Sequence, residues 1–434
     1  MSDPANTLGT PPGEPPSEAE VAPLKKLSTT LALLSVFRHR NYRLFFTGQL
    51  VSLMGSWMQN TAQPWLVYGL THSTVLLGLT SFCSTVPVFF MTPFGGMVAD
   101  RVDRRKMLLF TQSMAMAQAG VLAVLTLSGM VKVWEIICLA LTMGLINAFD
   151  IPSRQSMTLD MVGKEDLRSA IALNSMMFNA ARIIGPTIAG GLIALVGEGV
   201  CFALNSVSFG AVLISLILMR LTPREKRLQK NPLHEIADGY RYSFASPQIR
   251  LSLMLVMVAA MFGAAYVSMM PAVARDLLHG DARVVGLLMS ASGAGALIGA
   301  YLLSHIKDRQ LVYTPVVAGM VFGLGLILFS HSHALWLSAL LLLPTSGSLM
   351  LLGGTTNTII QMVAAEDYRG RVISHYTQSF MGMMPWGALL LGTVAHKLGV
   401  TNAITLGGSV VIACAALALY NRRSGSFAIP VPAE

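Results

Sequence analysis

Arg182 is the residue with the most unusual chemistry for its place in the sequence. It lies about thirteen residues into an apolar segment, residues 169–196, that we expect to cross a membrane. A bare cation near mid-membrane is costly, so Arg182 is predicted to face the interior of a helix bundle. No Asp or Glu lies at comparable depth elsewhere. Two roles stay open for Arg182: to bind an anionic substrate group, or to be satisfied by carbonyls and by the amides of Gln59, Asn147 and Asn179.

Other polar side chains inside apolar segments are candidates for the wall of a substrate cavity. Gln59 and Gln63 are four residues apart and therefore share one helix face. The remaining candidates are Asn147, Asn179, Tyr266, Asn357, Tyr376, Gln378 and Trp386. Each of them alone fits an interhelical hydrogen bond as well as a ligand contact.

The stretch from Gly95 to Lys106 is a charged connection between two apolar segments. Six of its twelve residues are charged, and four cations fall within six positions. A loop in water would not need a glycine pair directly before such a cluster. The pattern predicts a tight turn between two membrane helices, and the simplest role of its cations is to keep that turn in the cytoplasm.

The elements that must position these residues are membrane-spanning helices. Of 434 residues, 53% are hydrophobic and only 12% are charged, about half the charged share of a water-soluble domain. Continuous apolar runs exclude the alternating pattern of a membrane β-barrel. We therefore predict an all-α polytopic membrane protein with twelve spans. The predicted spans cover about residues 44–70, 75–99, 107–130, 133–151, 169–196, 200–219, 249–273, 284–306, 311–329, 334–363, 372–395 and 402–420.

The placement of the cations predicts the orientation of these spans. With the N-terminus inside, the inner connections hold almost every Lys and Arg, and the outer ones hold Lys132, Arg275, Arg283 and Lys397. This bias places both termini in the cytoplasm. The net charge of +9 is therefore a feature of membrane orientation and predicts no nucleic-acid partner. The four cysteines each lie in an apolar segment, and their spacing predicts neither a metal site nor a disulfide.

An internal repeat divides the chain into two halves. Residues 161–168 and 362–369 are identical at five of eight positions, and the two copies follow the fourth and tenth spans. We predict two pseudo-symmetric six-helix bundles, residues 37–221 and 249–421. A central cytoplasmic loop covers residues 222–248. The predicted cytoplasmic tails are residues 1–36 and 422–434. The first tail is predicted to be disordered, because residues 1–23 are rich in Pro, Glu, Ser and Ala.

The charged connection and the first half resemble a known family. Gly96, Asp100, Arg101, Arg104 and Arg105 match the loop between helices 2 and 3 of the major facilitator superfamily, although Asp103 stands where the family has Gly. Residues 147–155 and 180–191 resemble the branch that contains the enterobactin exporter and drug-efflux proteins. The resemblance implies the major facilitator fold. It also implies a gate in which Asp100 lies against helix 11 and Arg104 or Arg105 meets Asp150 in the outward-open state.

Two further features bear on coupling to an ion gradient. Gly185, Pro186, Gly190 and Gly191 resemble the helix 5 motif of antiporters, with one extra residue, although ordinary glycine packing explains them as well. Proton coupling is implied by the resemblance. The residues themselves offer only Asp150, with Arg154 four positions later, as a proton relay.

These patterns predict a secondary active exporter rather than an enzyme, since the chain has no phosphate-binding loop and no catalytic constellation. The expected substrate is a small amphipathic molecule, either a siderophore or a drug-like compound, moved by proton antiport without a cofactor. The alternatives are uptake of an anionic metabolite held by Arg182, and a non-transporting membrane scaffold or sensor. We expect a monomer in the bacterial inner membrane.

Overall fold

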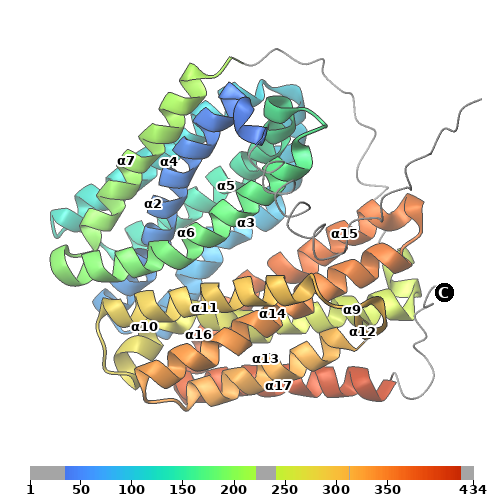
Figure 1. The fold of residues 1–434 in the computed structure, drawn as a ribbon. Coiled ribbons are helices and arrows are strands. Elements are labelled where there is room, and N and C mark those ends of the chain that lie inside the picture. The colour runs from blue at the N-terminus through green and yellow to red at the C-terminus, as the bar shows by residue number, and fades with distance from the viewer. Residues whose placement is uncertain (1–34, 221–240, 312, 422–434) are drawn as a thin grey trace, which may run out of the picture.

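The computed structural model describes residues 35–220, 241–311 and 313–421, and every regular element in these ranges is helical (Figure 1). The predicted tails and most of the predicted central loop lie outside the described residues. The side chains of Asp100 and Arg101 are not described either.

The helices up to residue 220 pack together as one group, here called the N-terminal group. Its members are η1 (Val36–Arg38), α2 (Arg40–Thr71), α3 (Thr74–Arg101), α4 (Arg104–Leu127), α5 (Val133–Val162), α6 (Leu167–Val196) and α7 (Glu198–Leu218). Small residues bring the helices close. A Cβ on Gly55 of α2 would lie 2.6 Å from the side-chain oxygen of Asn205 on α7, so only glycine fits there.

The remaining helices form the C-terminal group. It begins with one continuous helical rod, composed of α9 (Pro247–Val258), η2 (Ala259–Gly263), η3 (Ala264–Met269), α10 (Met270–Ala272) and η4 (Val273–Leu277). The others are α11 (Ala282–Leu303), α12 (Asp308–Leu311), α13 (Thr314–Ser330), α14 (Leu335–Val363), α15 (Glu366–Met381), α16 (Met384–Leu398) and α17 (Val400–Asn421).

Nine helical segments in the described ranges are long and apolar enough to cross a membrane, and α13 is a shorter apolar helix. The predicted count of twelve is not reached by length and composition. Gln49 and Gln59, both buried, make α2 less apolar than those nine segments. The eleventh predicted span is interrupted near Gly382, between α15 and α16. The all-α polytopic fold is confirmed, and the count of twelve spans stays a prediction.

The helix α5 is longer than the fourth predicted span, residues 133–151, because it continues to Val162. Met157, Met161 and Val162 are buried, so this part of the sequence is amphipathic rather than a loop. Pro152 removes one backbone donor from the helix. The Ser153 hydroxyl next to it donates to the Phe149 carbonyl of the same helix at 2.8 Å.

The two groups touch at one end and diverge at the other (Figure 1). The contacts run between α3 and α16, where the Thr74 hydroxyl donates to the Gly392 carbonyl at 2.9 Å, and between α6 and α11, where Gly190 lies against Ala282. We call this the closed end. The start of α2 and the start of α15 mark the open end.

Candidate functional site

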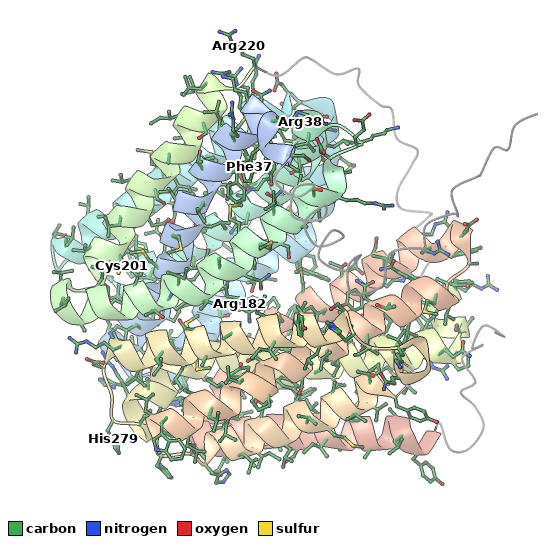
Figure 2. The ribbon with its side chains drawn as sticks, viewed as in Figure 1. Phe37, Arg38, Arg182, Cys201, Arg220 and His279 are labelled. Carbon is green, nitrogen blue, oxygen red and sulfur yellow. The ribbon has the colours of Figure 1, made fainter. Side chains whose placement is uncertain are left out.

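Arg182 lies where α6 of the N-terminal group faces α11 of the C-terminal group (Figure 2). Gly293 of α11 makes room for it, since a Cβ there would be 3.4 Å from the Arg182 Cγ. Arg182 is partly buried and forms no hydrogen bond or ion pair with another described residue. Its electrostatic neighbour is Tyr266. A cation at the boundary between the groups therefore keeps its hydrogen-bond donors available.

The three amides named as possible partners of Arg182 form no hydrogen bond with it. Gln59 is 4% exposed, and its amide donates to Gln118 at 3.2 Å and accepts from Asn205 at 2.7 Å. Asn179 donates to the Ser175 carbonyl of its own helix at 2.8 Å. Asn147 is half-buried and has no hydrogen bond to another described residue. Gln59 therefore joins three helices, and its contact with a substrate stays a prediction.

The other predicted cavity residues differ in how fully they are engaged. Gln63 is largely buried with no hydrogen bond to the described part of the chain. The Tyr266 hydroxyl lies 3.1 Å from Ser292 and 2.9 Å from Ser346. Tyr376 donates to the Gly353 carbonyl at 2.9 Å. Asn357 accepts from Gln361 at 2.9 Å, Gln378 is half-buried, and Trp386 stands edge-on to Phe82 across the two groups, 5.0 Å between ring centroids.

Asp150 on α5 is a buried carboxylate with a dense set of partners. It is 1% exposed, accepts from Thr111 at 2.8 Å and from Gln112 at 2.7 Å, and forms an ion pair with Arg154 one turn later. An ionised carboxylate inside a membrane protein requires such a partner. The predicted pairing of Asp150 with Arg154 is present.

Neither Arg104 nor Arg105 contacts Asp150 in this conformation. That pairing is predicted for the outward-open state and stays a prediction. Arg104 instead pairs with Asp160 at 2.6 Å, nearly three turns further along α5. Arg105 donates to the Leu216 and Ile217 carbonyls at the end of α7, both at 2.7 Å. Because α4 starts next to the extended part of α5, its first residues reach the acid near the α5 terminus and not the one buried inside.

The Asp103 side chain binds backbone amides at the start of α4. It is the N-cap of α4 and accepts from the amides of Arg105 at 2.8 Å and Lys106 at 3.2 Å. Asp103, which stands where the family has Gly, therefore caps the start of α4. Gly96 has open space around it, with no neighbour within 4 Å of a Cβ built there.

The glycines of the helix 5 motif set two close contacts. A Cβ on Gly185 would lie 2.6 Å from the Trp57 Cβ of α2, and one on Gly190 would lie 2.7 Å from the Ala282 carbonyl oxygen of α11. The Pro186 carbonyl lies against Gly286 of α11. Gly191 has nothing within 4 Å. This motif therefore lets α6 pack against both groups at the closed end.

Sequence reasoning missed a set of contacts that joins the two groups at the closed end. The Arg275 guanidinium stacks over the Trp65 ring, 4.1 Å from its centroid, and the Tyr68 hydroxyl donates to Asp276. We call these four residues the closed-end clamp. The charge pattern alone identifies Arg275 only as an outer-loop cation. The sequence does contain a hint of the contact, because Trp65 and Tyr68 lie near the outer end of the first predicted span and the Arg275–Asp276 pair directly follows the seventh predicted span.

Two groups of membrane-length helices, joined at one end around a cation that has no partner among the described residues, have the arrangement of a polytopic membrane transporter. The chain matches the model of the transmembrane secretion effector family over residues 31–427 and belongs to that family, a branch of the major facilitator superfamily. Its relatives in that family are transporters and not enzymes.

Curated relatives include the staphyloferrin A transporter of Staphylococcus aureus, 26% identical over 87% of this chain and 95% of that protein. The enterobactin exporter of Shigella boydii serotype 4 is 26% identical over 90% and 94%. Solved structures share the fold. A bacterial homologue of the human lysosomal transporter Spinster has a TM-score of 0.70 at 14% identity, covering 91% of this chain and 99% of its own. A bacterial homologue of the iron transporter ferroportin has a TM-score of 0.65 at 17% identity, covering 90% and 99%.

Proposed function

We propose that this protein is a secondary active exporter of a small amphipathic organic molecule with an anionic group, of the siderophore class. It works by alternating access in the bacterial inner membrane. The family match and the two siderophore-transporting relatives support this substrate class. The rocking bodies are the predicted bundles, residues 37–221 and 249–421, acting within a monomer.

Arg182 carries the proposal. Its guanidinium lies between the two groups, has no carboxylate partner in the described ranges, and has Tyr266 as its neighbour. A cation without a partner at this depth is costly unless a ligand supplies the opposite charge and accepts its hydrogen bonds. Catecholate and carboxylate oxygens of a siderophore would form charge-assisted hydrogen bonds with its planar donors. A drug-like compound would need an anionic or strongly electron-rich group to use the same anchor.

The distribution of charge supports an orientation. The open end carries Arg38 and the last turn of α7, to whose carbonyls Arg105 donates beside Arg104 and Lys106. Arg168 lies two residues after Asp166, the partner of Arg38. By the positive-inside rule this end faces the cytoplasm, as do both termini. In this conformation an exporter loads its substrate from inside. Transport then requires the closed-end clamp to open.

Proton antiport is assigned to Asp150. Protonation of this carboxylate would release Arg154 and the donors Thr111 and Gln112, which gives α5 two alternative arrangements. The helix 5 glycines allow the accompanying change between α6 and α11.

Uptake of an anionic metabolite is the second candidate, because Arg182 would anchor an anion moving in either direction. A vesicle assay separates the two functions and also excludes a scaffold. Purified protein in proteoliposomes is given a pH gradient of either sign, and flux of catecholate siderophores, dyes and small carboxylates is followed. Gradient-dependent movement of a siderophore against the proton flow is expected. A panel without any gradient-dependent flux would refute transport.

A further inference from the structure

A basic pocket lies at the open end of the N-terminal group, away from the transport site. Its volume is about 400 Å³, within the roughly 300–1,000 Å³ of small-molecule sites. It is lined by His39, Arg40, Asn41, Met161 and Arg220. Figure 2 shows Arg220 and Arg38 at this end. Because α2 starts and α7 ends here, the pocket lies at the level of the lipid headgroups.

The walls of the pocket are held together by hydrogen bonds between the two helices. The Asn41 amide donates to the Arg220 carbonyl at 2.8 Å, and the Arg220 amide donates back to Asn41 at 3.2 Å. Arg40 donates to the Leu218 carbonyl at 3.2 Å. Met161 is buried and gives the pocket an apolar floor. The fold therefore fixes the backbone of the pocket, the Asn41 side chain and the Met161 floor, and the exposed guanidinium groups of Arg40 and Arg220 supply its charge.

The two arginines of the pocket have no acidic partner among the described residues. Asp166 pairs with Arg38 at 2.9 Å and with His39, a lining residue, at 2.8 Å. The donors of Arg40 and Arg220 that make no hydrogen bond to a described residue lie beside the apolar Met161, and they are suited to a phosphate ester attached to an apolar body.

We propose that this pocket binds the phosphate of an anionic phospholipid headgroup of the cytoplasmic leaflet. The bound lipid would tie the start of α2 to the end of α7. The pocket contains none of the proposed transport residues, and only its assignment to the cytoplasmic leaflet rests on the proposed orientation.

The test is native mass spectrometry and fluorescence titration of the full-length protein with phosphatidylglycerol, with phosphatidylcholine as the neutral lipid. Phosphatidylglycerol is expected to stay bound to the wild type. Each basic side chain near an anionic headgroup contributes about a fivefold factor in affinity. Arg220→Gln should then bind about fivefold more weakly, and the Arg40→Gln/Arg220→Gln variant about 25-fold more weakly. Arg220→Gln removes no side-chain hydrogen bond, so it keeps the test valid if the double variant unfolds.

The matched control is Lys164→Gln/Arg168→Gln, which removes two exposed cations from the same end of the same group outside the pocket. It should leave phosphatidylglycerol affinity unchanged. Equal losses in both double variants would overturn the site, and so would equal binding of phosphatidylcholine. Inorganic phosphate is titrated in parallel. Displacement of the lipid by millimolar phosphate would keep the phosphate site but assign it to a soluble phosphorylated compound.

Discussion

The proposed transport residues include a cation without a partner among the described residues and an acid with several partners. Arg182 is left with donors to spare at the boundary of the two groups, whereas Asp150 is enclosed by Thr111, Gln112 and Arg154. Substrate recognition and coupling are thus assigned to different residues on different helices. Substrate recognition needs hydrogen-bond donors that have no partner within the protein, and coupling needs a group whose partners change with its charge.

Asp150→Asn should separate coupling from substrate movement. The amide cannot release a proton, so pH-driven accumulation is expected to fall to background while exchange of substrate down its own gradient continues. Removing one partner of a buried ion pair costs about 3–5 kcal/mol, so a lower melting temperature is expected as well. Asp160→Asn is the control, because it also removes an arginine-paired acid from α5. Undiminished pH-driven accumulation in Asp150→Asn would contradict the coupling role.

At the scale of elements, the closed-end clamp links α2 to the helical rod that runs from α9 to η4. Trp65→Leu removes the cation–π contact with Arg275, worth about 0.5–2 kcal/mol, so the state with separated closed ends should become about two- to thirtyfold more populated. Hydrogen exchange of the peptides around residues 68–76 and 277–283 measures this population. Trp134→Leu, an exposed tryptophan on α5, should change nothing there. Equal exchange in Trp65→Leu and the wild type would show that the clamp is not a gate.

The contacts of Asp166, the N-cap of α6, with Arg38 and His39 give a pH-dependent prediction. The hydrogen bond from His39, together with Ser35 and Arg38, holds the pKa of Asp166 below its ordinary value. A depressed pKa stabilises the folded state above the unfolded value, near 3.9, and this stabilisation is lost as the pH falls through the folded value. Asp166→Asn should therefore melt at a lower temperature than the wild type at pH 7, and the difference should shrink below about pH 4. Thermal melts in detergent measure it.

The exposed neighbour Glu165 is the control for that experiment, and Glu165→Gln should keep the wild-type profile. A constant difference between Asp166→Asn and the wild type from pH 7 to pH 3 would contradict the ion-pair explanation.

Sequence reasoning succeeded where the physical signal is local. Apolar length predicted the helical fold, and the depth of Arg182 in its segment predicted an inward-facing cation. It failed where the outcome depends on how helices meet. The burial of Met157 and Met161 depends on packing that accompanies the extension of α5 beyond its predicted span. Gln59 shows the same limit, since its role depends on the distant residues Gln118 and Asn205.

For the whole molecule, alternating access requires that the two groups approach closely at the closed end. Gly190→Val would place side-chain atoms against the Ala282 carbonyl and should hold the groups apart there, whereas Gly191→Val meets open space. We expect at least about a tenfold loss of transport for the first and near wild-type transport for the second, since overpacking costs about 1–3 kcal/mol. The vesicle assay measures both variants, with size-exclusion profiles as the folding check. Equal activity would show that this approach is not needed.

The central claim, that Arg182 anchors the anionic group of the substrate, is tested most directly by binding to purified protein. Titration calorimetry compares the wild type with Arg182→Ala and Arg182→Lys for whichever siderophore the vesicles transport. A lost charge-assisted hydrogen bond is worth about 1.5–3 kcal/mol, so Arg182→Ala should bind about 10- to 150-fold more weakly, with Arg182→Lys in between. Folded Arg182→Ala protein that binds the siderophore as tightly as the wild type would contradict the account.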